Sequence, residues 1–247
     1  MKILTLNCQK GYRPEIKSFL GKILGAEDYD FLLLQEASSP VIAMIKELNS
    51  SYKILDAFDE ALGENSHVCI LYKNKFDLAG NFFISFADFW GGKTPKGFLL
   101  GNFSEGGKNI CIGSAHLHSG LKPKIRMDEL KIIKGKLLEY KNENCPTVFG
   151  GDFNTGFPGE ISKSEKILSP EFIRVSKNLG TTLDSRYTEN ANHIANRTAV
   201  FLAKFGIGIK LRTDHIYADS TLAKTKTFSC KILPDRVSDH NPVECNF

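Results

Sequence analysis

The chain lacks the features of several protein classes. Its 247 residues include only six cysteines and no C-x-x-C pair, which excludes a zinc knuckle and a dense disulfide framework. No stretch approaches the ~18 apolar residues of a membrane-spanning helix. We see no internal repeat, low-complexity tract or Pro/Gly/Ser linker that would divide the chain. With 42% hydrophobic residues, the sequence predicts a single enzyme-sized domain over residues 1–247.

The net charge and the cysteines indicate which binding partners and which cellular location to expect. The 32 basic and 28 acidic residues give a net charge of +4, which favours anionic partners but is far from a histone-like excess. Basic residues interrupt the apolar positions of residues 1–30, so there is no leader pattern and we expect a cytoplasmic protein. A secreted form whose leader was removed is the alternative. We expect all six cysteines to be structural, with Cys8, Cys69, Cys111 and Cys230 as reduced apolar residues in strands.

Hydrophobic periodicity predicts alternating strands and helices in the first part of the chain. A β-rich run, KILTLNCQ, precedes a segment from Pro14 with apolar residues at helical spacing. The continuous apolar run YDFLLLQE fits a strand buried on both faces, and a helix over about Pro40–Leu48 follows it. From Tyr52 to Ala115, short β-like runs separated by turn residues predict an antiparallel meander.

The second half predicts a matching arrangement. A helix over about Pro123–Tyr140 carries one apolar stripe, and PTVFGGDFN then reads as another strand. Residues 155–198 are less regular, and three β-like runs close the chain near 210–218, 226–233 and 242–247. These halves predict an α/β fold, a four-layer α/β sandwich with two central mixed β-sheets and helices packed on the outside.

Polar residues end several of the buried runs. The residues in these positions are Asn7, Glu36, His116, Asp152, Asp214, Asp239 and His240. Any one of them alone is better explained as a turn, a cap or a hydrogen-bonded core residue. A carboxylate at the end of a buried strand must nevertheless be paired, hydrogen-bonded or bound to a cation. Together the strand ends predict a site at one edge of the sheets.

At this point the chain resembles the endonuclease/exonuclease/phosphatase superfamily of phosphoesterases. The motifs that carry the resemblance are LTLNCQ at 4–9, LLLQE at 32–36, SAHLHS at 114–119, GGDFN at 150–154, RTDHIYA at 212–218 and SDHNPV at 238–243. They occur in the order of the family and span nearly the whole chain. GGDFN and SDHNPV are the most specific of them. The resemblance implies a Mg²⁺- or Mn²⁺-dependent hydrolase of phosphoester bonds.

The resemblance also implies metal ligands and a base. Glu36, supported by Asn7 and Asp239, would hold the ion, since Mg²⁺ and Mn²⁺ prefer hard oxygen ligands. Asp152 would orient or deprotonate the attacking water, and Asn154 would fix the Asp152 carboxylate or bind a phosphoryl oxygen.

Three further roles follow from the same resemblance. His240 would hydrogen-bond a non-bridging oxygen in the transition state, and Asp214 would hold the imidazole in place. His116 would contact the phosphate from the other side. His118 is an alternative for that contact, because a shift of two residues keeps a side chain on the same face of a strand. We favour His116.

The sequence departs from the apurinic endonuclease branch, since Gln9 follows Cys8 and the Y-x-P-N string is missing, so abasic-site repair is disfavoured. His215 also follows Asp214 where many relatives have an aromatic residue. We expect a nuclease or phosphodiesterase acting on DNA or RNA, as a monomer. The alternative substrate is a small phosphorylated metabolite or a lipid headgroup, for a phosphatase or sphingomyelinase-type enzyme. A third alternative is a degenerate member that serves as a binding scaffold.

The sequence contains only weak signals for the class of substrate. Residues 121–143 and 204–236 are net basic, which fits either a nucleic-acid track or an ordinary solvated surface. The segment 190–205 could place an aromatic ring beside a base or a lipid, although a place in the buried core is the favoured role for it. The ISFADFW segment at 84–90, with Phe86, Phe89 and Trp90, is a second candidate of the same kind.

Overall fold

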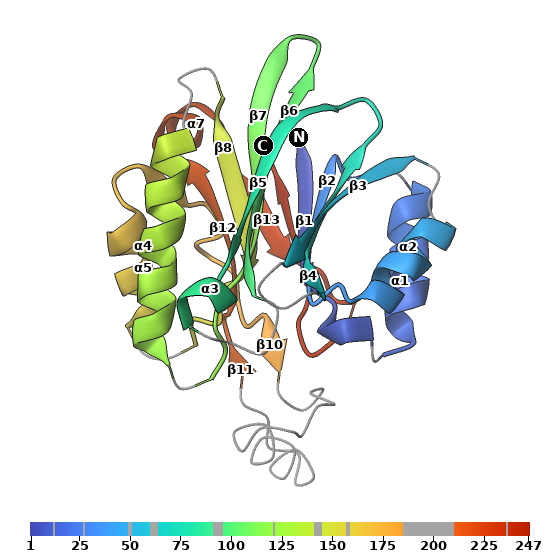
Figure 1. The fold of residues 1–247 in the computed structure, drawn as a ribbon, viewed down its shortest axis with the longest axis horizontal. Helices are drawn as coiled ribbons and strands as arrows, with labels where there is room; N and C mark the ends of the chain where they lie inside the picture. The colour runs from blue at the N-terminus through green and yellow to red at the C-terminus, as the bar shows by residue number, and fades with distance from the viewer. Residues whose placement is uncertain are drawn as a thin grey trace, which may run out of the picture.

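The computed structural model describes residues 1–11, 13–26, 28–48, 51–59, 64–90, 96–120, 122–140, 145–156, 159–184, 210–235 and 237–247. Two six-stranded sheets form the centre of the molecule, and helices cover their outer faces (Figure 1). Two short strands, β10 (Leu183–Asp184) and β11 (Lys210–Leu211), pair with each other at one end of the sheets. This arrangement confirms the predicted α/β sandwich of two mixed sheets.

The first sheet has the strand order β13-β14-β1-β2-β4-β3. Its strands are β1 (Lys2–Asn7), β2 (Phe31–Gln35), β3 (Tyr52–Asp59), β4 (Glu64–Lys73), β13 (Ser229–Ile232) and β14 (Val243–Asn246). β1 and β2 are parallel and the other pairs are antiparallel. Helices α1 (Glu15–Ala26) and α2 (Ser39–Leu48) lie against its outer face (Figure 1). The apolar stripe predicted for the first helix is buried there, from Ile16 to Leu24.

The second sheet has the strand order β5-β6-β7-β8-β12-β9. Its strands are β5 (Asp77–Ser85), β6 (Gly97–Glu105), β7 (Lys108–His116), β8 (Thr147–Asp152), β9 (Phe172–Arg174) and β12 (Asp214–Asp219). β7 and β8 are parallel, so each sheet is mixed. Helices α4 (Pro123–Tyr140) and α5 (Glu160–Leu168) lie beside it, and the short helices are α3 (Ala87–Trp90) and α7 (Ser220–Thr225).

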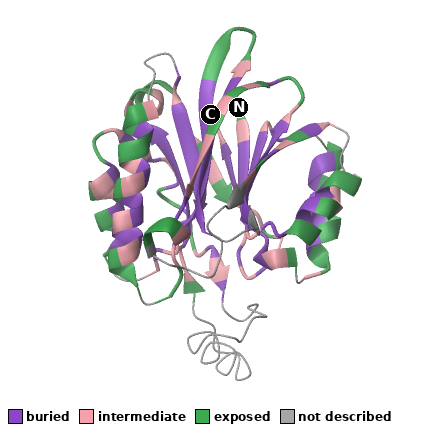
Figure 2. Ribbon diagram, viewed as in Figure 1, coloured by how far each residue is buried: buried purple, intermediate pink, exposed green. Residues whose placement is uncertain are grey.

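The main core lies between the two sheets. Alternate residues of β2 face the two sides: Phe31 and Leu33 enter the layer between the sheets, whereas Leu32 and Leu34 pack under the first helix pair. All five residues of this strand are buried, as the continuous apolar run predicted. Figure 2 shows the buried strands inside and the exposed faces of the helices outside.

Two predictions about the organisation were wrong. The β-runs from Tyr52 to Ala115 do not form one meander, because β3 and β4 belong to the first sheet while β5, β6 and β7 belong to the second. Residues 155–198 were expected to be less regular, but α5 and β9 lie among the residues described there. Apolar periodicity cannot show which sheet a strand joins, since hydrogen bonds between distant strands decide that.

The expectation for one cysteine was also wrong. Cys230 and Cys245 lie directly opposite each other on β13 and β14, and they form a disulfide. Cys8, Cys69, Cys111 and Cys145 are free and buried, as small apolar residues in strands commonly are. Among the described residues, no helix is both long and apolar enough to cross a membrane.

Candidate active site

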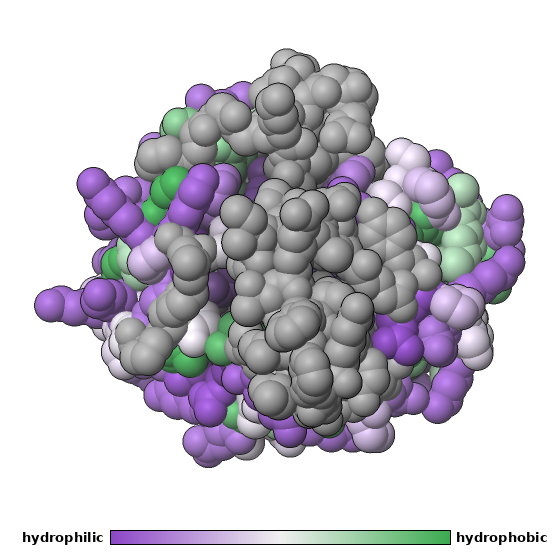
Figure 3. Space-filling model, turned by 90° about the horizontal axis from the view of Figure 1, so that it is seen from below, coloured by the Kyte–Doolittle hydropathy of each residue, from purple (hydrophilic) through white to green (hydrophobic). Residues whose placement is uncertain are grey.

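The polar strand ends converge at one end of the two sheets. Asn7 ends β1, His116 ends β7 and Asp152 ends β8, while Asp214 begins β12 directly opposite Asp152. His116 is also in register with Asp152. This is the lower end of the molecule in Figure 1, away from both termini. Figure 3 views this end, and hydrophilic side chains predominate among the described residues around its edge.

Asp152 is the hub of the site. Its Oδ2 accepts hydrogen bonds from Asn7 Nδ2 (3.0 Å) and Asn154 Nδ2 (3.1 Å), and its Oδ1 accepts one from the backbone N–H of Asn154 (2.9 Å). The same Oδ2 lies 3.6 Å from His116 Nε2 and 3.7 Å from His240 Nε2. Burial, together with the nearby Asp214, raises the pKa of Asp152 to about 6, although His240 opposes the rise. A carboxyl group with this pKa is suited to accept a proton near neutral pH.

Local backbone geometry fixes this hub. Gly151 has a φ of 147°, and a Cβ there would meet the carbonyl oxygen of Ala115 at 2.0 Å, so β7 and β8 can approach closely only with glycine. Asn154 and Glu36 both have a φ of 51°, a left-handed conformation that is uncommon for residues with a side chain. Such backbone strain is often found at functional sites.

His240 and Asp214 form a buried ion pair. His240 Nδ1 lies 2.9 Å from Asp214 Oδ2, which also accepts a hydrogen bond from Thr213 Oγ1 at 3.0 Å. Burial alone would lower the pKa of His240, but Asp214 and Asp152 hold it well above its usual value. The imidazole is therefore a cation whose Nε2 faces Asp152. Thr182 and Ser238 complete the support, accepting the backbone N–H of Asp214 and of His240.

Glu36 and Asp239 are the residues that fit a divalent cation. Glu36 is partly exposed, with 27% of its side chain accessible, and its Oε1 lies 3.8 Å from His116 Nε2. The carboxylate of Asp239 lies beside His240, with 4.0 Å between Oδ1 and Nε2. Carboxylate oxygens that solvent can reach suit Mg²⁺ or Mn²⁺, which keep several water ligands.

The amide of Asn7 links several groups of the cluster, and its role as a metal ligand stays a prediction. Its Oδ1 accepts the backbone N–H of Gln9 (2.9 Å), and its Nδ2 donates to Asp152 and to Glu36 Oε1 (3.4 Å). Asn7 therefore aligns two carboxylates with its NH₂ group. Its oxygen is turned away from them.

Asp152, Asp214 and His240 also bring one ligand-type atom each within 4.8 Å of one another. We do not assign a metal to this group. The Oδ2 atoms of Asp152 and Asp214 already accept hydrogen bonds from side-chain amides and from a hydroxyl group, and Asp214 Oδ2 also lies 2.9 Å from His240 Nδ1.

A buried lysine completes the cluster and was not anticipated from the sequence. Lys96 is 5% exposed, and its Nζ lies 2.7 Å from His116 Nε2 and 3.1 Å from the carbonyl oxygen of Leu117. An ammonium group can only donate, so His116 Nε2 must be the acceptor. Burial and the Lys96 charge hold the pKa of His116 well below its usual value, which keeps the imidazole neutral. Before the apolar run GFLLGNF, this lysine looks like any exposed turn residue.

The structure separates the two candidate histidines. β7 ends at His116, so the alternation of the strand does not continue to His118. His118 instead turns to α4, where its Nδ1 lies 3.3 Å from Glu129 Oε1. Only His116 lies in the cluster, and the argument that both side chains share one face was wrong.

The aromatic candidates are placed only in part. Ile84 is partly buried and Phe86 is buried, whereas Phe89 is 52% exposed. Phe83, Ile84 and Phe89 line a groove of about 500 Å³ between the end of β5 and α4. The Trp90 side chain and the whole of segment 190–205 lie outside the described residues.

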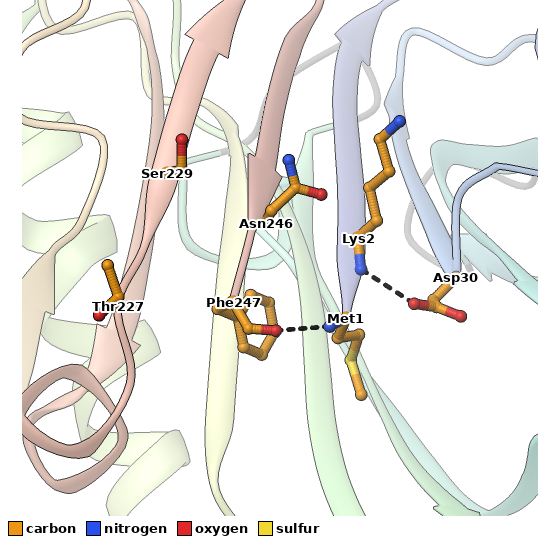
Figure 4. Close-up of a pocket in the computed structure, with 7 residues that line it drawn as sticks. All are labelled: Met1, Lys2, Asp30, Thr227, Ser229, Asn246 and Phe247. Atoms are coloured by element: carbon orange, nitrogen blue, oxygen red, sulfur yellow. Dashed lines mark hydrogen bonds between the residues drawn. The ribbon is translucent and has the colours of Figure 1, made fainter.

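A separate cavity lies at the opposite end of the first sheet (Figure 4). It has a volume of about 390 Å³ and is lined by Met1, Lys2, Asp30, Thr227, Ser229, Asn246 and Phe247. The backbone N–H of Lys2 donates to Asp30 Oδ2 there (2.9 Å). Lys2 begins β1 and Asn7 ends it, so the length of this strand separates the cavity from the cluster.

Comparison with known proteins places the fold. No family model matches the chain, and no curated protein matches it in sequence. Among solved structures, TDP2 from D. rerio complexed with single-stranded DNA product matches with a TM-score of 0.76 at 17% identity, over 99% of this chain and 97% of that one. A mannosyl-6-phosphatase from Bacteroides thetaiotaomicron matches with a TM-score of 0.73 at 18% identity, over 100% and 98%.

A third similar structure carries the name of the family that the motifs resemble. It is an endonuclease/exonuclease/phosphatase family protein from Bacteroides thetaiotaomicron, with a TM-score of 0.71 at 18% identity over 99% of this chain and 93% of that one. Six motifs in family order and a fold shared over the whole length agree with each other. The chain therefore has the fold of the endonuclease/exonuclease/phosphatase superfamily, as the sequence predicted.

Proposed function

We propose that this protein is a divalent-metal-dependent phosphoesterase that cleaves a P–O bond by attack of water, and that its substrate is DNA or RNA. The observation that carries the proposal is the environment of Asp152. This buried carboxylate accepts hydrogen bonds from two side-chain amides and lies between a neutral imidazole and a cationic one. A general base, Asp152, next to a cationic imidazole, His240, suits a reaction in which water is activated and negative charge develops on a phosphoryl group.

Each residue then has a role at a stated atom. Asp152 takes the proton of the attacking water, and Asn154 fixes its carboxylate. His240 donates from Nε2 to a non-bridging phosphoryl oxygen, while Asp214 orients the ring through Nδ1. Glu36 and Asp239 would hold Mg²⁺ or Mn²⁺, and Asn7 aligns Glu36 with Asp152. When bound, the ion neutralises developing charge on the phosphate and the leaving oxygen.

Nucleic acid is the first substrate class to test. The chain has a net charge of +4, and the similar TDP2 structure was determined with a single-stranded DNA product. A phosphatase or sphingomyelinase-type activity is the second candidate. The apolar groove beside Phe89 could receive a lipid, and another similar structure is a mannosyl-6-phosphatase.

A substrate panel tests the proposal. Purified protein is incubated with Mg²⁺, with Mn²⁺ or with EDTA on supercoiled plasmid, labelled single-stranded DNA and RNA, bis-p-nitrophenyl phosphate, p-nitrophenyl phosphate and sphingomyelin. Metal-dependent cleavage of nucleic acid is the expected result. Turnover of only the monoester or the lipid would establish the second candidate, and inactivity on every substrate would contradict the proposal.

The Glu36→Gln variant should need more metal. An amide in place of this carboxylate removes a charged oxygen ligand, so we expect the Mg²⁺ concentration for half-maximal activity to rise by roughly tenfold or more. Glu105→Gln is the control, because Glu105 is the last residue of β6, at the far end of the sheet. A metal titration of Glu36→Gln that overlays the wild-type curve would remove Glu36 as a ligand.

The Lys96→Met variant should be slower. It removes the cation that donates to His116 Nε2, and we expect kcat/KM to fall roughly 10- to 100-fold, in the range found when charged groups beside a reacting centre are lost. Methionine keeps the length and apolar stem of the side chain. Lys108→Met, at the exposed start of β7, should leave kcat/KM unchanged. If both variants behave alike, Lys96 is not part of the machinery.

Location is the prediction that the structure supports least. The Cys230–Cys245 disulfide is of a kind that persists in oxidising compartments and is rare in the cytosol. The cytoplasmic location therefore stays a prediction, and a secreted form stays its alternative.

A further inference from the structure

The backbone N–H and C=O of Leu117 join three residues of the site. Its N–H donates to the carbonyl oxygen of Asp152 at 2.9 Å. Its carbonyl oxygen accepts Lys96 Nζ at 3.1 Å and Asn154 Nδ2 at 3.0 Å. Lys96 in turn reaches His116, and Asn154 reaches the carboxylate of Asp152. A displacement of this one carbonyl would therefore move two side chains that contact the reacting groups.

Leu117 lies just beyond the end of β7, and the sheet holds only its N–H, through the carbonyl oxygen of Asp152 at the end of β8. Residues on the outer helices hold the segment 117–120. Arg126 Nη1, from α4, donates to the carbonyl oxygens of His118 (3.0 Å) and Gly120 (2.7 Å). Glu129 Oε2, one turn further along α4, accepts the backbone N–H of His118 at 2.9 Å. Both ends of this short segment are thus fixed by side chains from one helix.

Arg126 is itself fixed by the next helix. Its Nε and Nη2 both donate to Oε1 of Glu160, the first residue of α5, at 3.1 and 2.6 Å. Arg126 and Glu129 are 0% exposed and Glu160 is 2% exposed. Charged groups buried to this degree carry a large desolvation cost, and apolar residues of similar volume often replace such pairs without loss of stability. Stability alone is therefore a weak reason for this group of three residues.

We infer that Arg126, Glu129 and Glu160 are positioning residues for the active site. They fix the Leu117 carbonyl, which holds Lys96 against His116 and Asn154 against Asp152. Among the described residues, the hydrogen bonds of Arg126 and Glu129 reach the site through segment 117–120, and Glu160 reaches it through Arg126. The inference rests on the function proposed above for that site.

A pair of double variants tests the inference. In Arg126→Met/Glu160→Leu, both charges of the buried pair are removed together, which avoids an unpaired buried charge and preserves the fold. Arg174→Met/Glu165→Leu is the control, because Arg174 Nε on β9 donates to Glu165 Oε1 on α5 at 2.8 Å, and 37% of the Glu165 side chain is exposed. Both proteins should keep the thermal stability of the wild type to within a few degrees.

The expected result is a difference in catalysis between the two. On bis-p-nitrophenyl phosphate, the Arg126/Glu160 variant should lose roughly 10- to 100-fold in kcat/KM, the usual effect of removing groups that orient a site, and the control should lose none. Adding Lys96→Met to the Arg126/Glu160 variant should lower kcat/KM much less than Lys96→Met does in the wild type. The reason is that the Arg126/Glu160 variant has already lost the contact between Lys96 and His116. In the control background the losses should add. Glu129→Gln, which keeps an acceptor for the His118 N–H, should retain most of the activity.

Equal activity of the two double variants, or additive losses with Lys96→Met in both, would overturn the inference. A crystal structure of the Arg126/Glu160 variant gives a second readout that does not depend on activity. Lys96 Nζ remaining within hydrogen-bond distance of both His116 Nε2 and the Leu117 oxygen would also overturn it. Absence of metal-dependent turnover in the wild-type protein would instead contradict the proposed function, and the crystal structure would then decide the positioning by itself.

Discussion

Asp152→Ala should abolish catalysis while leaving a folded protein. We expect kcat to fall by roughly a hundredfold or more, the usual effect of removing a general base, on whichever substrate of the panel is turned over. Asp152 is 1% exposed, and its carboxylate accepts hydrogen bonds from Asn7 Nδ2 and from the backbone N–H of Asn154. Among the described carboxylates, only Asp152 has these two contacts. The measurement is kcat at saturating Mg²⁺, beside Asp128→Asn as a control at a partly exposed position on α4.

Asp152→Asn adds a stability test with a definite sign. Because burial raises the pKa of Asp152 to about 6, the folded protein binds this proton more tightly than the unfolded chain does. The ionised carboxylate therefore destabilises the fold increasingly as pH rises from about 4, the ordinary pKa of an aspartate, to about 6, and the penalty stays constant above that. A neutral amide removes the penalty, so Asp152→Asn should melt at a higher temperature than the wild type at pH 8. A variant that is both active and less stable at pH 8 would contradict the role and the environment assigned to Asp152.

His240→Ala should have an effect of similar size. We expect a loss of roughly a hundredfold or more in kcat/KM, as for other donors that stabilise charge developing on an oxygen. Asp214→Asn should lower kcat as well, because it removes the carboxylate that keeps the imidazole charged and oriented. The two residues act as a unit, so the double variant should be hardly worse than His240→Ala alone.

His215 offers a matched control for this experiment. It is adjacent to Asp214 and fully buried, but its Nε2 hydrogen-bonds Thr155 at 2.8 Å, and burial lowers its pKa to about 3. A neutral imidazole packed against Phe153 and Tyr217 is a core residue, so His215→Phe should keep near wild-type kcat/KM. If His240→Ala were as active as His215→Phe, His240 would not be the phosphate-binding cation.

The sequence alone determined the architecture and most of the site. Continuous apolar runs such as Phe31–Gln35 are buried on both faces, and the stripe on Pro123–Tyr140 packs against a sheet. A buried strand must end in residues that can be satisfied at its edge, so the polar residues after these runs marked one end of the sheets. Asn7, His116, Asp152, Asn154, Asp214 and His240 meet there, with Glu36 and Asp239 beside them. Their chemical roles remain predictions until they are measured.

Only the tertiary structure decided how these groups are joined. Periodicity reports which residues are buried, but a hydrogen bond between distant residues depends on the path of both chain segments. In the sequence, Lys96 is indistinguishable from an exposed turn lysine, and only the structure shows that it contacts His116. Arg126 is likewise one of many charged residues on a helix, and only the structure shows that it bonds to segment 117–120. The Cys230–Cys245 bond required the register of β13 and β14, which no spacing in the sequence gives. The sequence predicts which groups lie at the site because a pattern of burial can be read along the chain. Their alignment depends on contacts between distant residues, which only the folded chain brings together.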